Sequence, residues 1–207
     1  MKSNGLMNRF DTFVFDWDGT LSSLKVLRLV NERINPYWRY RKSHALSEKV
    51  KKKNMHSKSR GIRMVAPFVD VSFMVIRPKL HNDSREVLDE LKKRRKTIAL
   101  FTNGAEYRVL PELKKLKIDS YFKIIISAQE VGALKPNPAG LNIAIHHLKA
   151  SKARTIYIGD MADDIIMAKY AKVASCAIAE GFDSYGKLKA SKPDYIFTSM
   201  EEFRRAL

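Results

Sequence analysis

The fold is decided by the stretch FVFDWDGTL, residues 13–21, in which an apolar run ends in two carboxylates one residue apart and then in Gly-Thr. The run predicts a short buried strand that carries acid groups to the rim of a sheet. Because side chains alternate along a strand, Asp16 and Asp18 would share a face, where two like charges resist burial unless something positive lies between them. A hard cation bound by oxygen ligands would satisfy both. The other interpretation is a plain strand and turn, since Asp-Gly is common in turns.

The composition is that of one domain, or of one domain with an inserted module. The chain has 207 residues, 45% of them hydrophobic, which is enough for a sizeable core. Its single Cys176 excludes an intramolecular disulfide and a cysteine-rich metal cluster, and this fits a reducing, cytoplasmic location. Residues 1–9 contain no signal-peptide pattern and no run is long enough to cross a bilayer, so we expect no membrane partner. Met7 offers an alternative start.

The net charge of +17 is concentrated in one segment. Residues 22–79 hold 15 Lys and Arg against three acidic residues, so they carry +12 of the total. Such an excess favours contact with anions, which include phosphorylated metabolites, nucleic acid and anionic surfaces. A generally basic proteome would give the same composition without any such partner.

The same segment also differs in pattern. Apolar residues recur at helical spacing from residue 24 to residue 34, a basic stretch with three aromatic residues follows, and an apolar stretch around Pro67 completes it. We therefore predict an inserted, mainly helical module over residues 22–79.

Strands and helices alternate through the rest of the chain. The predicted strands are residues 11–15, 97–101, 122–126, 155–158, 174–179 and 195–197, and the predicted helices are residues 83–95, 105–116, 138–149 and 165–171. The first of these helices opens with what resembles a capping box, from Asp83 to Glu86. This order predicts a Rossmann-like, three-layer α/β/α core with a parallel sheet, built from residues 1–21 and 80–207.

Chemically active side chains follow three of the predicted strands. The first strand ends in Asp16 and Asp18, the second in Thr102-Asn103, and the fourth in Asp160 with two further acids at 163 and 164. Ligands of open parallel sheets bind beyond the carboxyl ends of the strands, so we expect these residues to lie together. Lys135, flanked by prolines in the loop GALKPNP (residues 132–138), would supply a positive charge.

The set resembles the phosphatase branch of the haloacid dehalogenase (HAD) superfamily. The four motifs of that family match DWDGT at residues 16–20, Thr102, Lys135 and GDMADD at residues 159–164, in the family's order. The resemblance covers the core on both sides of the insertion. The tail, residues 181–196, looks like the phosphoglycolate phosphatase-like group.

The resemblance implies a role for each motif residue. Asp16 would be the nucleophile that forms an aspartyl-phosphate, and Asp18 the general acid/base, whose presence in the family marks phosphatases rather than dehalogenases. Thr102 would bind a phosphoryl oxygen, helped by backbone amides near Asn103 and Gly104. Lys135 would contact the phosphoryl group and offset its charge.

The resemblance also implies Mg²⁺ as the cofactor. Its ligands would be Asp16, Asp160 and the backbone carbonyl of Asp18, with Asp164 orienting a metal-bound water or Lys135. Asp163, next to Asp164, is expected to be peripheral, although the sequence leaves the choice between the two open.

The segment of residues 22–79 lies where the superfamily places a C1-type cap, but it is short and unusually basic for one. The leading expectation is a phosphatase for a small phosphate monoester, such as phosphoglycolate or a sugar phosphate. The alternatives are hydrolysis of pyrophosphate or a nucleotide, and a nucleic-acid-binding role of the basic segment, whose aromatics Tyr37, Trp38 and Tyr40 would stack on bases or simply pack the module. The histidines, His81 and the pair His146-His147 among them, lack partners at metal-ligand spacing and are expected at the surface.

Overall fold

The computed structural model describes residues 5–23 and 79–207. They belong to a compact unit that the chain's internal contacts separate from residues 24–77. The predicted insertion of residues 22–79 therefore lies almost wholly outside the described residues, and its helical character stays a prediction.

The core is one parallel sheet of six strands in the order β3-β2-β1-β4-β5-β6. The strands are β1 (Thr12–Phe15), β2 (Thr97–Thr102), β3 (Ile124–Ser127), β4 (Thr155–Gly159), β5 (Ala174–Ile178) and β6 (Tyr195–Phe197). All five pairings are parallel, and β1 lies between β2 and β4 in the middle of the sheet. The chain order reverses at β1, which makes the carboxyl edge of β1 the expected place for a ligand.

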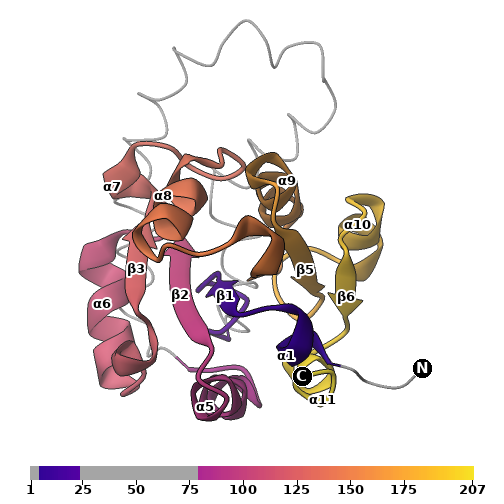
Figure 1. Cartoon of the computed structure of the whole chain (residues 1–207), viewed down its shortest axis with the longest axis horizontal. Coiled ribbons are helices and arrows are strands. Elements are labelled where there is room, and N and C mark those ends of the chain that lie inside the picture. The colour runs from indigo at the N-terminus through magenta and orange to yellow at the C-terminus, as the bar shows by residue number, and fades with distance from the viewer. Residues whose placement is uncertain (1–4, 24–78) are drawn as a thin grey trace, which may run out of the picture. The chain divides into compact units, whose positions relative to one another are not determined.

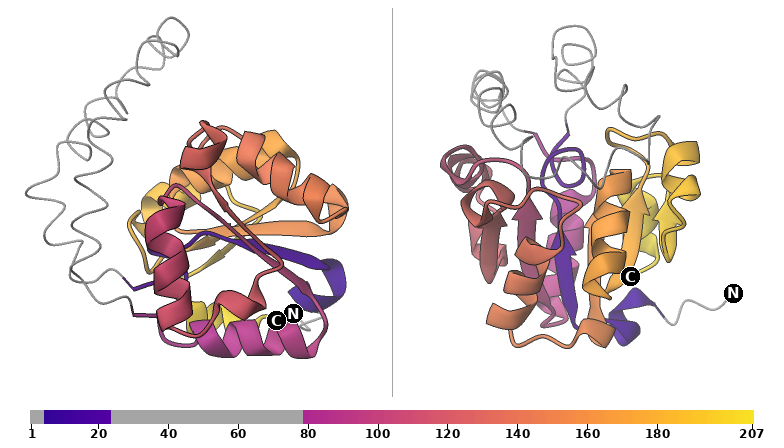
Figure 2. Two further views of the ribbon diagram at one scale, coloured as in Figure 1. Left: turned by 90° about the vertical axis from the view of Figure 1, so that its left-hand side faces the viewer. Right: turned by 90° about the horizontal axis from the view of Figure 1, so that it is seen from above.

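Helices cover both faces of this sheet (Figures 1 and 2). The helices are α1 (Leu6–Arg9), α5 (Ser84–Lys93), α6 (Glu106–Lys115), α7 (Ala128–Val131), α8 (Ala139–His147), α9 (Ala162–Ala171), α10 (Tyr185–Ala190) and α11 (Met200–Arg205), with short 3₁₀ turns at Asp119–Tyr121 and Lys152–Arg154. The predicted three-layer α/β/α architecture is confirmed.

The alternation of side chains along β1 divides the core in two. Phe13 and Phe15 pack on one face with the apolar sides of α1, α5, α6 and α11, whereas Val14 packs on the other with α8 and α9. All four residues of β1 are buried, as the continuous apolar run predicts for a central parallel strand. Fully burying a side chain of this size stabilises a fold by roughly 1.5–3 kcal/mol.

The predicted elements after residue 79 all form, with boundaries that differ by at most three residues. Four short helices were not predicted: α1, α7, α10 and α11. The first and last of them lie side by side in Figure 1, because the Leu6 amide donates to the Ala206 carbonyl across the whole chain. Helices of four to six residues carry too little periodicity to be recognised from the sequence.

The predicted capping box of α5 is wrong. Asp83 precedes the helix, but its backbone is left-handed (φ 63°) and its side chain makes no cap hydrogen bond. Its carboxylate instead accepts from Arg204 Nε at 2.6 Å. The Asp83 side chain therefore binds Arg204, 121 residues further along the chain, and does not cap the helix as the local spacing predicted.

The chain leaves and re-enters this unit at one place. The Ser23 amide donates to the Lys79 carbonyl at 2.7 Å, and the His81 amide donates to the Leu21 carbonyl at 2.9 Å. Ser84 Oγ donates to the same Leu21 carbonyl. Hydrogen bonds thus join the segment that leaves the unit to the segment that re-enters it, directly after the motif at residues 16–20.

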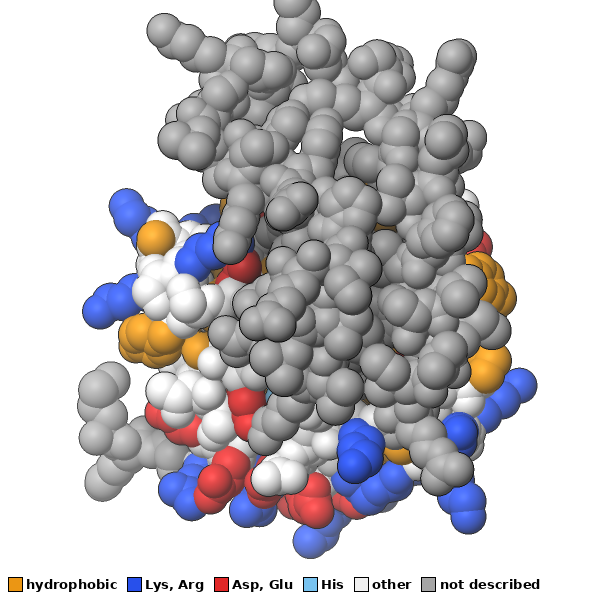
Figure 3. Space-filling view, turned by 180° about the vertical axis from the view of Figure 1, so that it is seen from behind, with side chains coloured by type: hydrophobic (Ala, Val, Ile, Leu, Met, Phe, Trp, Pro, Cys, Tyr) orange, Lys and Arg blue, Asp and Glu red, His pale blue; other side chains and the backbone are white. Residues whose placement is uncertain are grey.

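The described surface is mixed in charge. In Figure 3, Lys and Arg side chains alternate with Asp and Glu along the lower part of the visible face. The described surface also carries exposed ion pairs such as Arg94–Glu90 and Arg205–Glu201. Within the described ranges, no helix has the length and apolar character needed to span a membrane.

Candidate active site

The site begins at three neighbouring strand ends. Asp16 directly follows β1, Thr102 is the last residue of β2, and Asp160 directly follows β4. Since β2, β1 and β4 are adjacent and parallel, their carboxyl ends lie next to one another at one edge. This register brings the three motif residues to one edge of the sheet.

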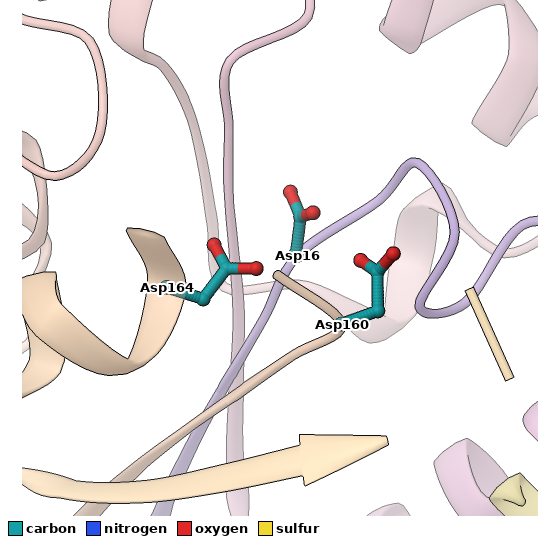
Figure 4. A group of neighbouring side chains, drawn as sticks. All are labelled: Asp16, Asp160 and Asp164. Carbon is teal, nitrogen blue, oxygen red and sulfur yellow. The ribbon is translucent and has the colours of Figure 1, made fainter. Parts of the chain in front are cut away.

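Three carboxylates converge at this edge. One oxygen each from Asp16, Asp160 and Asp164 lies within 4.8 Å of the others, and all three residues are buried. Figure 4 shows Asp16 at the end of β1, Asp160 beyond β4, and Asp164 reaching in from the first turn of α9. We call these three residues the acid group.

Lys135 is the ammonium of this site. Its Nζ lies 2.6 Å from Asp16 Oδ1 and 2.9 Å from Asp164 Oδ1, and its side chain is buried. The same Nζ is 5.6 Å from the centre of the Phe101 ring and 5.3 Å from that of Tyr157, within cation–π range. The loop at residues 132–138 therefore places one positive charge between two acids.

Burial sets the electrostatics of the site. It is the main cause that raises the pKa of Asp16 to about 7, with Lys135 acting against it and Asp164 adding to it. Burial, together with the charges of Asp16 and Asp164, also raises the pKa of Asp160 well above its ordinary value. Burial alone would lower the pKa of Lys135, but the two paired carboxylates outweigh it and raise that pKa, so the lysine stays charged.

Asp160 is held by groups that sequence reasoning did not single out. Thr20 Oγ1 donates to its Oδ1 at 2.9 Å and the Phe182 amide donates to its Oδ2 at 2.7 Å. The residues before Thr20 and Phe182 are both glycines, and a larger residue would not fit at either position. A Cβ on Gly19 would lie 2.4 Å from Asp160 Oδ2, and one on Gly181 would lie 2.1 Å from the same atom. The DWDGT motif and the tail thus close around one carboxylate.

Of the two neighbouring acids, Asp164 lies in the acid group and Asp163 does not. Asp164 Oδ2 accepts from the Met161 amide at 2.9 Å, which fixes this side chain at the start of α9. Asp163 is half-buried and lies outside the group. Asp183 adds a second anchor for this helix start, because its Oδ2 accepts from the Ala162 amide at 2.8 Å.

Asp18 does not join the acid group. Its carboxylate is held by Arg108, with Nη1 at 3.1 Å from Oδ1 and Nη2 at 2.5 Å from Oδ2. The side chain of Asp18 is thus turned to α6, while the predicted metal contact through its backbone carbonyl stays a prediction. Sequence reasoning missed Arg108 and its partner Glu112, although their spacing of four residues on a helix is a known pairing signal.

Thr102 and Asn103 line the second strand end. Thr102 is buried and its Oγ1 accepts from the Gly104 amide at 3.0 Å, so the turn after β2 is folded around it. Asn103 Oδ1 accepts from the Lys135 amide at 3.0 Å. Its side chain therefore positions the lysine loop, which adds a task to the phosphate contact that the motif implies.

One histidine prediction is wrong. His81 is buried, and its Nδ1 lies 3.6 Å from Glu180 Oε1. It follows the re-entry at Lys79, a junction that local sequence gives no means of placing. His146 and His147 are exposed as expected, and His44 and His56 lie outside the described residues.

The donor set suits a divalent cation. Three buried carboxylates face a single ammonium, that of Lys135. When all three acids are ionised, the acid group and Lys135 together carry a net charge of two negative units. Carboxylate oxygens are hard ligands of the kind that Mg²⁺ prefers, and Mg²⁺ ordinarily completes its shell with water and substrate phosphate. Asp16, Asp160 and Asp164 are the described residues that would hold it or its bound waters.

The fold and the site together define a Rossmann-like α/β protein whose ligand site lies at the carboxyl edge of the sheet, at the reversal of strand order. The chain belongs to the haloacid dehalogenase-like hydrolase family, whose model matches residues 13–178. The resemblance to the phosphatase branch is confirmed by relatives with phosphatase names.

Two of these relatives show the range of names. Pyrophosphatase PpaX from Bacillus mycoides is 31% identical over 117 residues, which cover 56% of this chain and 54% of that protein. Phosphoglycolate phosphatase from Vibrio parahaemolyticus is 33% identical over 125 residues, which cover 59% and 54%. This chain is thus matched over only about half the length of these curated relatives.

Solved structures support the fold. A predicted phosphatase from Clostridium acetobutylicum superposes with a TM-score of 0.73 at 20% identity, over 95% of this chain and 97% of that one. A haloacid dehalogenase-like protein from Streptococcus pneumoniae gives 0.68 at 18% identity, over 94% and 97%.

Proposed function

We propose that the protein is a Mg²⁺-dependent phosphatase that hydrolyses a small phosphate monoester through an aspartyl-phosphate on Asp16. The observation that carries this proposal is the buried acid group with Lys135 inserted between Asp16 and Asp164. A carboxylate pair around an ammonium would be a poor choice for structure alone, because desolvating charges costs as much as their attraction returns. The same arrangement is well suited to receive a phosphoryl group.

The first step is transfer of the phosphoryl group to Asp16. Lys135 holds Oδ1 of Asp16, so Oδ2 is the oxygen that attacks phosphorus, while the bond from phosphorus to the leaving oxygen breaks. Asp18 gives a proton to that leaving oxygen. Lys135 and the Thr102 hydroxyl offset the negative charge on the transferring group.

The second step is hydrolysis of the aspartyl-phosphate. Asp18, now deprotonated, takes a proton from a water molecule that attacks phosphorus, and the bond from phosphorus to Asp16 Oδ2 breaks. Inorganic phosphate leaves and Asp16 is restored. Bound Mg²⁺ would supply charge neutralisation for the phosphoryl oxygens.

Residues 22–79 are proposed as the cap that selects the substrate, by their place in the chain between the first and second motifs. Phosphoglycolate and sugar phosphates are the leading substrate class, supported by the phosphoglycolate phosphatase relatives. Pyrophosphate is the second candidate, because other relatives carry the name pyrophosphatase. Nucleic-acid binding by the basic segment stays a prediction from sequence.

The test is a substrate screen with the full chain. Phosphate release is measured with 4-nitrophenyl phosphate, phosphoglycolate, sugar phosphates, nucleotides and pyrophosphate, in Mg²⁺ and in EDTA. We expect turnover only with Mg²⁺, and its loss in Asp16→Asn. Asp163→Asn is the matched control, since it removes a neighbouring acid outside the acid group and should keep turnover. Hydrolysis by Asp16→Asn at the wild-type rate would refute the mechanism.

A further inference from the structure

Arg108 is an unusual residue for its position. Its side chain is 2% exposed, whereas arginine is rarely buried without a specific partner. It comes from α6, the helix that follows β2, and none of the four sequence motifs includes it. Both of its terminal nitrogens point at Asp18, one to each carboxylate oxygen, in the forked geometry that fixes a carboxylate in orientation as well as in position.

Arg108 is itself held from behind. Its Nη1 also lies 3.0 Å from Oε2 of Glu112, one helical turn further along α6. Glu112 Oε2 accepts in turn from Trp17 Nε1 at 2.7 Å. Trp17 stands between Asp16 and Asp18 in the chain and is fully buried. The contacts thus form a closed circuit that starts and ends within residues 16–18.

The backbone beside this circuit leaves room for it. A Cβ on Gly104 would lie 2.2 Å from Arg108 Nη2 and 3.2 Å from Asp18 Oδ2. The turn after Thr102 therefore passes directly against the pair, and a glycine stands where any other side chain would collide with it. This second observation ties the pair to the phosphate-binding turn.

We propose that Arg108, braced by Glu112 and Trp17, is a positioning residue that sets the orientation of the Asp18 carboxylate for proton transfer. The proposal rests on the proposed function, in which Asp18 serves the leaving oxygen and then the water. Lysine would replace Arg108 only in part, since an ammonium is a point charge and cannot engage both oxygens in a fork.

The leaving group supplies the test. Departure of 4-nitrophenolate needs little help from an acid, whereas an alkoxide leaves only when it is protonated. Arg108→Gln should therefore reduce kcat/KM for an alkyl phosphate by about 10²-fold, within the range of general acid catalysis, and that for 4-nitrophenyl phosphate by less than about tenfold. The alkyl phosphate is glycerol 2-phosphate, or the best alkyl ester of the screen.

Three further variants make the test specific. Asp18→Asn should show the same selective loss, and the double variant Asp18→Asn/Arg108→Gln should be no slower than Asp18→Asn, because the two residues act as a unit. Arg108→Lys should lie between wild type and Arg108→Gln. Should Arg108→Gln fail to fold, Arg108→Lys and Glu112→Gln carry the same comparison.

Equal losses on both substrates, or losses that multiply in the double variant, would overturn the positioning role and leave Arg108 as a structural residue. Absence of wild-type turnover on every ester would instead count against the proposed function. The two failures are therefore distinguishable.

Discussion

Thr20 donates a hydrogen bond from Oγ1 to Asp160 Oδ1 at 2.9 Å, joining two buried residues that lie 140 positions apart in the chain. The bond fixes the orientation of an acid whose other oxygen accepts from the Phe182 amide. Both donors favour the charged form of Asp160 and so act against the burial that raises its pKa. In the proposed site they would hold this carboxylate in place for Mg²⁺. Groups that hold a ligand in this way commonly matter nearly as much as the ligand itself.

The first prediction concerns this bond. Thr20→Val keeps the shape of the side chain but removes the donor, so we expect Mg²⁺ to be required at about tenfold higher concentration for half-maximal activity. Thr20→Ser, which keeps the hydroxyl, is the control and should stay close to wild type. A Mg²⁺ titration of phosphatase activity measures both, and an unchanged requirement in Thr20→Val would contradict the prediction.

The second prediction concerns pH. Burial raises the pKa of Asp16 to about 7, above the value of about 3.9 for an unfolded aspartate, so between these values the folded state binds more protons than the unfolded state. Stability of the metal-free protein should therefore fall as pH rises from about 4 to 7, by several degrees in Tm. Asp11, whose pKa is lowered mainly by its hydrogen bond with Arg154, acts in the opposite sense but at lower pH.

Thermal unfolding in EDTA across this pH range measures the effect. Addition of Mg²⁺ should flatten the dependence, because a bound cation takes the place of the proton. Asp16→Asn should reduce it as well, without Mg²⁺, and Asp160, whose pKa burial also raises, would supply the remaining dependence. A Tm that rises between pH 5 and 7 in the metal-free wild type would show that another group dominates.

The third prediction concerns Gly181. A Cβ there would lie 2.1 Å from Asp160 Oδ2 and 2.4 Å from the Gly19 carbonyl oxygen, and the latter is backbone that cannot swing away. We expect Gly181→Ala to cost about 1–3 kcal/mol of unfolding free energy, as overpacking does, and to raise the Mg²⁺ concentration needed for half-maximal activity, because it displaces Asp160.

Gly186 is the matched control. It lies in α10, and a Cβ on it would meet nothing within 4 Å. Gly186→Ala should be neutral or stabilising by up to about 1 kcal/mol, since alanine is the better helix former. Urea unfolding of both variants measures the difference, and equal effects would show that the close approach at Gly181 is unimportant.

The sequence predicted the strand ends well for a physical reason. Asp16, Thr102 and Asp160 each follow a continuous apolar run, and parallel strands necessarily bring such ends to one edge. Lys135 was placed only through its motif, because nothing in its loop says which acids it will meet. Its aromatic neighbours Phe101 and Tyr157 looked like ordinary core residues of β2 and β4.

Pairings between distant segments could not be predicted. The fork from Arg108 to Asp18 joins positions 90 residues apart, and the circuit behind it depends on how α6 packs on the sheet. Asp83 is an example in which the local pattern gave a wrong prediction. The pattern indicated a helix cap, but the carboxylate binds Arg204 in the folded protein. Local rules describe what a side chain can do, and tertiary packing decides which partner it has.

The fourth prediction separates the two tasks that Lys135 could have. Its Nζ touches Asp16 and Asp164, so it could organise the acid group or act on the phosphoryl charge. If the second task dominates, Lys135→Met should lower kcat by about 10²–10³-fold, as loss of a charge-stabilising group does. Mg²⁺ binding should at the same time stay unchanged or tighten, because the acid group loses its competing cation. Isothermal titration with MgCl₂ and steady-state kinetics on the same protein preparation measure both quantities. A parallel fall of Mg²⁺ affinity and turnover would instead assign Lys135 to holding the acid group in shape, and turnover of Lys135→Met would then recover at high Mg²⁺.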